Sequence, residues 1–256
     1  MIACKNFGSE KNSKYFLDLF SIVPPLSEQK QISDYLDRKT QQIDDLIEKT
    51  ERKIELLKEQ RSSLINQCVT KGLDPNVEMK DSGVEWIGEI PKGWKLGIVA
   101  DVSDQQKLGI SPNNYPDEVF LHFSIPAFDE GQVPVEESGN AIKSNKTIVP
   151  ADSVLVSKLN PNTPRVWIPS LARDKRQICS TEFLVYLPKN GVSQTYLWSV
   201  FCEKGLQRRV EAMVTGTSKS HQRVKPKDIL NLQICIPPKS LIKHFGDICT
   251  PITQRI

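Results

Sequence analysis

The sequence predicts an α+β fold, in which a mixed α/β globular domain is joined to one long, coiled-coil-forming α-helix. Residues 27–70 contain neither glycine nor proline, so no strong helix breaker interrupts that stretch. Residues 97–236 alternate short apolar, β-rich runs with turn signals, as strand-rich domains do. The 256 residues, of which 38% are hydrophobic and 25% are charged, are enough to bury a core around these elements.

The long helix is expected to occupy a spacer segment at residues 24–72. Residues 1–23 before it are predicted to be the remnant of a preceding globular domain, ending in the strand-like run YFLDLFSIV. Two adjacent prolines then stop regular structure, and Ser27 is the expected N-cap of the helix. Gly72 is the expected C-cap. The helix between these caps would be about 66 Å long at 1.5 Å per residue.

Apolar residues in the long helix recur at alternating spacings of three and four residues. This spacing is typical of a coiled-coil seam, and the other faces carry Asp, Glu, Lys, Arg and Gln. The alternative is an amphipathic helix that lies on its own domain's core, although such helices usually have a wider apolar stripe. Thr40, Thr50 and Arg61 weaken the seam and are expected to fix its register. We expect two such helices to pair antiparallel in a homodimer through Leu36, Ile43, Ile47, Ile54, Leu57 and Leu64.

The rest of the chain divides into a linker, a globular domain and the start of another helix. Residues 73–96, with their Gly and Pro punctuation and two tryptophans, are predicted to form an ordered linker. The globular domain at residues 97–236 is expected to have one helix at about residues 193–213. Residues 237–256 are predicted to begin a second long helix. Strands are expected at VFLHFSI, KTIVPADSVLVSKL, RVWIPSL, EFLVYLP and ILNLQICIP.

An internal repeat relates the two ends of this organisation. FLDLFSIVPPLSEQKQISDYL, starting at Phe16, resembles ILNLQICIPPKSLIKHFGDIC, starting at Ile229. Each segment is predicted to be a strand, then Pro-Pro, then a capping serine and an amphipathic helix. The repeat predicts a unit of globular domain, Pro-Pro and long helix, of which this chain holds a phase-shifted portion with one complete globular domain.

Composition argues against several classes of protein. No run approaches the roughly 18 apolar residues of a membrane span, and the N-terminus has no apolar signal-peptide core, so we expect a cytoplasmic protein without membrane contact. The six cysteines are scattered, with no CxxC pair, which is typical of reduced thiols rather than of a zinc site or a disulfide framework. No metal or other cofactor is expected.

Charge is unevenly distributed along the globular domain. Residues 158–227 contain 13 Lys and Arg against 4 Asp and Glu, whereas residues 95–157 contain 4 against 9. This asymmetry indicates a side of the domain that faces a polyanion.

The chain resembles a known family, the DNA-specificity subunits of type I restriction-modification systems. The resemblance lies in IVPPLSEQKQISDYLDRKTQQIDDLIEKTERKIELLKEQRSSLINQCVTKGL, in DSGVEWIGEIPKGW, and in GTSKSHQRVKPKDILNLQICIPP, which is similar to the end of a target-recognition domain. It implies a truncated or phase-shifted subunit with one target-recognition domain, which reads half of a bipartite sequence in double-stranded DNA. It also implies that the helix docks methyltransferase (modification) subunits, and that a restriction subunit completes the enzyme.

No catalytic motif accompanies this resemblance, so the chain is expected to bind DNA without activity of its own. Neither a GxGxxG nor a GxxxxGK[ST] phosphate cradle is present. Two basic, hydrogen-bonding loops and one further basic cluster are the candidate interface, because Arg and Asn suit base edges and Lys suits phosphate. The candidate DNA-binding residues are Lys158, Asn160, Asn162, Arg165, Arg173, Lys175, Arg176, Lys219, Ser220, His221, Arg223 and Lys225.

Two other interpretations remain open on the sequence. The chain could be a coiled-coil assembly or regulatory protein whose globular domain binds another protein. It could also be a fragment of a single-chain methyltransferase–nuclease. Salt-dependent DNA binding separates the first alternative from a specificity subunit, and the absence of methyltransferase motifs weighs against the second.

Overall fold

The computed structural model describes residues 23–169, 174–215, 222–242 and 245. The chain divides into two compact units, Met1–Glu55 and Leu56–Ile256. The strand expected before the first Pro-Pro pair lies outside the described residues. Of the second long helix, residues 239–242 and 245 are described and are helical. Within the described residues, no helix is long and apolar enough to cross a membrane.

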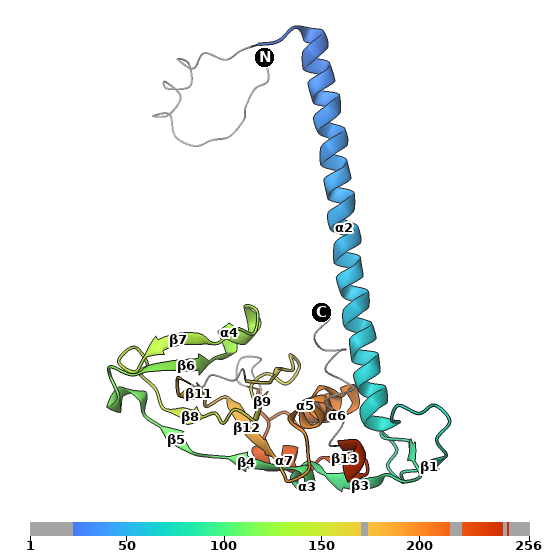
Figure 1. The fold of residues 1–256 in the computed structure, drawn as a ribbon, viewed down its shortest axis with the longest axis vertical. Coiled ribbons are helices and arrows are strands. Elements are labelled where there is room, and N and C mark those ends of the chain that lie inside the picture. The colour runs from blue at the N-terminus through green and yellow to red at the C-terminus, as the bar shows by residue number, and fades with distance from the viewer. Residues whose placement is uncertain (1–22, 170–173, 216–221, 243–244, 246–256) are drawn as a thin grey trace. The chain divides into compact units, whose positions relative to one another are not determined.

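Helix α2 is continuous from Leu26 to Thr70 (Figure 1), as the absence of Gly and Pro predicts. It begins one residue earlier than expected, so Ser27 lies in the first turn rather than at the N-cap position. The carbonyl oxygen of Pro25 instead accepts the first backbone hydrogen bonds, from the N–H groups of Glu28 and Gln29, each at 2.9 Å. Gly72 ends the helix in the left-handed conformation, at φ +78°, which glycine adopts without steric cost.

The second unit contains the end of α2 and a set of short strands and helices. The strands are β1 (Met79–Asp81), β2 (Glu89–Pro91), β3 (Lys95–Ile98), β4 (Ser103–Gln106), β5 (Gly109–Ile110), β6 (Val119–Phe123), β7 (Val135–Ser138), β8 (Lys146–Ile148), β9 (Val154–Ser157), β10 (Val166–Trp167), β11 (Gln177–Ser180), β12 (Phe183–Pro188) and β13 (Gln233–Ile236). The helices are α3 (Val99–Val102), α4 (Ile125–Asp129), α5 (Gln194–Cys202), α6 (Lys204–Ala212) and α7 (Pro226–Leu230), with the 3₁₀ turn η1 at Pro112–Asn114.

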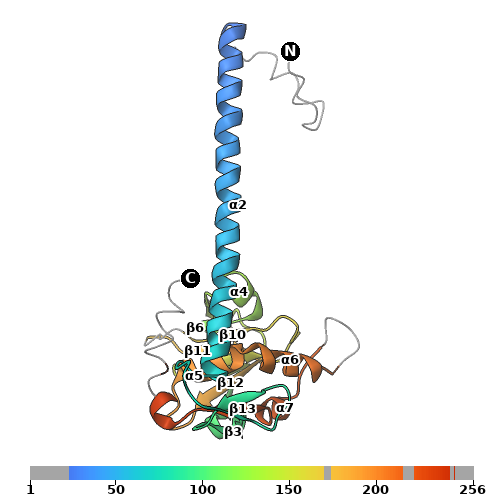
Figure 2. The same cartoon turned by 90° about the vertical axis from the view of Figure 1, so that its right-hand side faces the viewer.

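A four-stranded sheet of order β10-β9-β12-β4 forms the centre of this unit. Alternate residues along its strands enter two different cores. Val154 and Tyr186 pack with α5, α6 and the last turns of α2, and Figures 1 and 2 show these helices side by side. Leu155 and Val185 point to the other face, where they pack with Phe123 of β6. The central sheet is therefore buried on both faces.

A five-stranded sheet of order β5-β8-β11-β6-β7 covers the second face. Strands β11 and β6 pair in parallel, with Ile178 opposite His122, and the other pairs in this sheet are antiparallel. The indole of Trp167 fixes the contact between the sheets, because its ring makes edge contacts with Phe123 at 4.8 Å and with Phe183 at 6.3 Å between centroids. Strand β11 was not among the predicted strands.

In this unit one sequence prediction is wrong and another is confirmed only in part. The single helix expected at residues 193–213 is broken at Glu203, whose backbone is extended at φ −66° and ψ 129° and whose carboxylate caps α6. The strand expected in ILNLQICIP begins only at Gln233, because Pro226 starts the short helix α7, which continues through Leu230.

The segment that was predicted to be a linker contains regular structure. Strands β1 and β2 form an antiparallel pair, with Lys80 opposite Ile90. Strand β3 then pairs with β13, with Leu96 opposite Cys235. The end of the linker segment and the last described strand are therefore neighbours, packed around Trp94.

Candidate nucleic-acid interface

The structure brings together the two loops that the sequence singled out. The N–H of Asn160 donates to the carbonyl oxygen of Gln222 at 2.9 Å, and the N–H of Val224 donates to the carbonyl oxygen of Lys158 at 3.1 Å. An antiparallel β-bridge joins Leu159 to Arg223 between these bonds. We call residues 158–165 and 222–225 the paired loops. Their backbones are paired, so polar side chains from both loops are held at one place.

Arg223 is fixed to this place through its backbone and its side chain. A second β-bridge joins its backbone to Thr215. Its Nε and Nη2 donate to the two carboxylate oxygens of Glu182, at 3.1 and 3.0 Å. The carbonyl oxygen of Glu182 in turn accepts from the N–H of Lys158 at 3.0 Å. The carboxylate raises the pKa of Arg223 above its usual value by hydrogen bonding to it, so the guanidinium carries its full charge.

Arg165 has a different environment, although it lies in the first of the paired loops. Its Nε and Nη2 donate to the carboxylate of Asp129 at 2.7 and 2.9 Å, and its Nη1 donates to the carbonyl oxygen of Thr163 at 3.2 Å. Only 10% of its side chain is exposed. Hydrogen bonding from Arg165 lowers the pKa of Asp129. Arg165 therefore braces the loop from inside, and little of its side chain is accessible to a ligand.

Lys175 and Arg176 form a separate cluster at the beginning of β11, at the opposite end of that strand from Glu182. Lys175 Nζ lies 2.5 Å from Glu136 Oε1, and Arg176 forms a bidentate pair with Glu118. The Arg176 guanidinium also lies over the ring of Tyr115, 4.2 Å from its centroid. The structure therefore does not bring this cluster to the paired loops.

The remaining candidates differ in accessibility. Lys225 and Asn162 are exposed, and Lys158 is half-buried. Asn160 is in the left-handed conformation at φ +47°, and its Oδ1 atom is buried without a hydrogen-bond partner among the described residues. The candidates Arg173, Lys219, Ser220 and His221 lie outside the described residues.

Sequence reasoning did not identify the carboxylates that pair with these cations. Asp129, Glu118 and Glu136 all come from the acidic stretch at residues 95–157, and they pair with cations of the basic stretch at residues 158–227. These ion pairs therefore neutralise part of the charge difference between the two stretches. The excess of acids in the first stretch is the only signal in the sequence that could have indicated these pairs.

The predicted coiled-coil seam of α2 has two parts. Leu36, Ile43, Ile47 and Ile54 are exposed. Leu57 and Leu64 are half-buried, and the neighbouring Ile65, Cys68 and Val69 are buried in the core formed with α5 and α6. The last turns of α2 thus pack on the core of their own domain, which was the alternative to a coiled-coil seam. The apolar residues before these turns are exposed to solvent.

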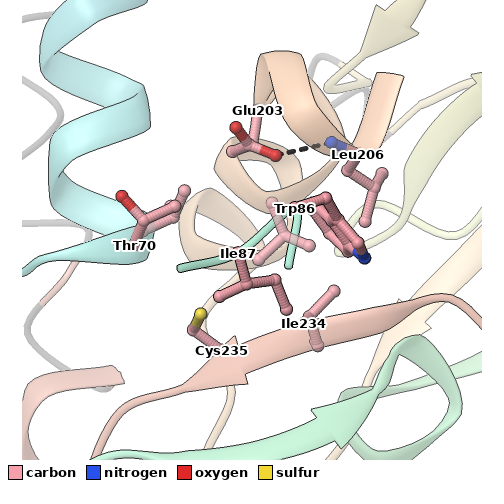
Figure 3. Close-up of a pocket in the computed structure, with 9 residues that line it drawn as sticks. Thr70, Trp86, Ile87, Glu203, Leu206, Ile234 and Cys235 are labelled. Atoms are coloured by element: carbon pink, nitrogen blue, oxygen red, sulfur yellow. Dashed lines mark hydrogen bonds between the residues drawn. The ribbon is translucent and has the colours of Figure 1, made fainter. Parts of the chain in front are cut away.

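A cavity of about 200 Å³ lies where the end of α2 approaches the α5–α6 junction and β13 (Figure 3). Its walls include Trp86, Leu206 and Ile234. The carboxylate of Glu203 accepts hydrogen bonds from the N–H groups of Gly205 and Leu206, at 2.7 and 2.6 Å, and is committed to capping α6. Burial raises the pKa of Cys235 to about 12, so its thiol is protonated at neutral pH and is a poor nucleophile. Among the described residues, no group of three or more His, Cys, Asp or Glu could hold a metal ion.

Comparison with known proteins finds curated relatives and several similar structures. The chain is 33% identical over 95 residues to the type I restriction enzyme MjaVIII specificity subunit of Methanocaldococcus jannaschii, an alignment that covers 37% of this chain and 21% of that protein. The predicted resemblance to type I restriction enzyme specificity subunits is thereby confirmed. No protein-family profile matches the sequence.

Two solved structures share the fold. The crystal structure of the HsdS subunit from Thermoanaerobacter tengcongensis matches 91% of this chain and 52% of its own length, with a TM-score of 0.51 and 14% identity. A chain from a structure of complex assembly and conformational transition in a type I R-M system matches 64% of this chain and 43% of its own length, with a TM-score of 0.52 and 21% identity. The predicted α+β fold with a long helix is confirmed, and the chain spans about half the length of these structures.

Proposed function

We propose that this chain, a relative of type I restriction enzyme specificity subunits in sequence and fold, recognises a DNA sequence and has no catalytic activity of its own. The observation that carries the proposal is the joining of the paired loops, which gathers Lys158, Arg223 and Lys225 beside hydrogen-bonding side chains. Cations supply the sequence-independent attraction to phosphates, and rigidly held polar groups can read base edges. The globular domain would contact one half of a bipartite target in this way.

The free cations of the paired loops support this role. The side chains of Lys158 and Lys225 make no ion pair with any described residue, in contrast to Arg165 and Arg223. A lysine without a carboxylate partner keeps its full attraction for a polyanion. We assign phosphate contacts to these two lysines.

We further propose that α2 is the assembly element of the protein. Its exposed residues Leu36, Ile43, Ile47 and Ile54 form an apolar stripe with the 3-4 spacing of a coiled-coil seam. A second copy of the chain, paired antiparallel, would cover this stripe and present two recognition domains to a spaced, symmetric target. In this proposal the paired helices also dock the modification subunits, and a restriction subunit joins to form the complete enzyme.

Selection of bound sequences from a random DNA duplex tests the proposed function. The full chain is used with its modification subunits, and the selected pool is sequenced. A recurring, spaced sequence motif with affinity that falls steeply as salt is added is the expected result. Binding of no duplex, or equal binding of all duplexes, would favour instead a coiled-coil assembly protein whose globular domain binds another protein.

A further inference from the structure

We infer that Arg223, held in place by Glu182, reads a guanine in the DNA target. This inference rests on the proposed function and adds to it one named contact and one base. It starts from the number of donors on a guanidinium group, which carries five N–H bonds in a planar fork. Glu182 accepts from Nε and from Nη2 of Arg223. The Nη1 group and the second Nη2 hydrogen remain, and they form the outer edge of the fork.

Within the described part of the chain, that outer edge has no partner. The Arg223 side chain is 40% exposed, against 24% for Glu182, and the guanidinium makes no further hydrogen bond to a described residue. Two parallel N–H donors match the O6 and N7 acceptors that guanine presents in the major groove, which is the commonest specific contact between arginine and DNA. The other bases do not offer two acceptors in that position.

The position of the guanidinium is defined by the structure around it. The Arg223 backbone exchanges hydrogen bonds with Thr215, at 3.0 and 3.2 Å, and the adjacent Val224 is buried in the core. The carboxylate of Glu182 then fixes the side chain itself. A reading group that is already ordered loses less conformational entropy on binding, so more of its interaction energy is available to distinguish bases.

The ion pair also makes Arg223 more suitable for recognising a base than for sequence-independent attraction to phosphates. Glu182 offsets the charge of Arg223, so replacing this arginine should remove little of the counterion release that sets the salt dependence of binding. Lys225 has no such partner among the described residues, and its loss should have the opposite effect. The two residues therefore have distinguishable signatures.

The other described arginines of the candidate set are less suitable readers. Arg165 has donors engaged on all three of its nitrogens and a largely buried side chain. Arg176 is bound to Glu118 and stacked on Tyr115, and it lies at the far end of β11 from the paired loops. Arg223 alone among these three combines a fixed position, an open edge and a place in the paired loops.

The test compares the sequences that four proteins select from random duplex DNA: the unchanged chain, Arg223→Lys, Glu182→Gln and, as the matched control, Lys225→Ala. All are used as full chains with their modification subunits. Lysine keeps the charge but loses the fork, so Arg223→Lys should reduce the preference for guanine at one position of the motif by about tenfold. Glu182→Gln should weaken the same preference, because the amide has one acceptor oxygen where the carboxylate has two, and its NH2 group faces a donor of the guanidinium. Other positions of the motif should stay unchanged.

The control and the salt dependence separate the possible outcomes. Lys225→Ala should lower the affinity for all sequences and reduce the slope of log affinity against log salt concentration by about one. The preference for guanine at that position of the motif should remain. If Arg223→Lys and Glu182→Gln, both folded by circular dichroism, select the same motif as the unchanged chain, the inference is wrong and the proposed function stands. If Arg223→Lys fails to fold, an unaltered motif with Glu182→Gln is enough to overturn the inference. If the unchanged chain selects no sequence, the proposed function itself fails.

Discussion

The guanidinium of Arg61, near the end of α2, lies over the indole ring of Trp198 in α5, with its Cζ atom 5.2 Å from the ring centroid. The indole N–H of Trp198 donates to the carbonyl oxygen of Val166 in β10, at 3.3 Å. Arg61 occupies a position of the predicted coiled-coil seam, yet its contact is with its own domain. One of the three residues that weaken the predicted seam thus marks where α2 joins the globular core.

Replacing Trp198 should destabilise the domain far more than replacing Arg61. Trp198→Ala removes a buried indole and its hydrogen bond, and should lower the free energy of unfolding by about 3–5 kcal/mol. Arg61→Ala removes a cation–π contact of about 0.5–2 kcal/mol. Arg52→Ala, at an exposed position of the same helix, is the control and should change stability by less than about 0.5 kcal/mol. Urea denaturation measures all three, and equal effects of the Arg61 and Arg52 variants would show that the cation–π contact contributes nothing.

Introducing Asp at both Ile47 and Ile54 should dissociate the proposed homodimer. Both side chains are exposed in the single chain, so the change would bury two carboxylates in the paired seam without affecting the core of the monomer. Sedimentation at tens of micromolar protein should show a dimer for the unchanged chain and a monomer for the variant. The control carries Asp at Gln42 and Lys49, on the opposite face of the helix, and should remain dimeric. A dimer that survives the seam substitutions would place the contact elsewhere.

The Asp129–Arg165 pair should make stability depend on pH in the acid range. The pKa of Asp129 is lowered in the folded protein, chiefly by the hydrogen bond from Arg165. A depressed carboxyl pKa stabilises the fold above the ordinary value of 3.8, and this contribution is lost as the pH falls through the lower, folded value. Because Asp129 is 45% exposed, solvent screening reduces the contribution.

Asp129→Asn tests this pair directly. At pH 7 the variant should be less stable by about 1–2 kcal/mol, since it leaves the buried guanidinium of Arg165 without its counter-charge. The difference between the variant and the unchanged chain should shrink as the pH falls below about 4. Urea denaturation at a series of pH values measures it, and a difference that stays constant from pH 7 to pH 3 would contradict the assigned role of the pair.

The sequence predicts α2 well because the relevant signals are local. An uninterrupted stretch between two prolines and Gly72 leaves few alternatives to a helix. The break at Glu203 is less visible, because apolar residues with helical spacing continue on both sides of it and only the tertiary core decides where the chain bends. Strand β11 is only four residues long, and it becomes a strand because β6 and β8 lie on either side of it.

In the candidate site, too, the features with local signals could be predicted and those that depend on tertiary contacts could not. The composition of the paired loops predicts a polar, basic surface, and the structure places both loops together. Their carboxylate partners could not be predicted, because Asp129, Glu182 and Glu118 lie 36, 41 and 58 residues from the arginines they bind. Only the folded chain shows that Arg165 is committed to bracing its loop whereas Arg223 keeps an open edge.

The salt dependence of DNA affinity is the most direct test of the paired loops as the DNA-contacting surface. The measurement is the dissociation constant of the selected duplex at a series of salt concentrations, for the unchanged chain and for a Lys158→Ala, Lys225→Ala double variant. Loss of two phosphate contacts should reduce the slope of log affinity against log salt by about two and weaken binding at low salt. An unchanged slope and affinity in a folded double variant would contradict the account.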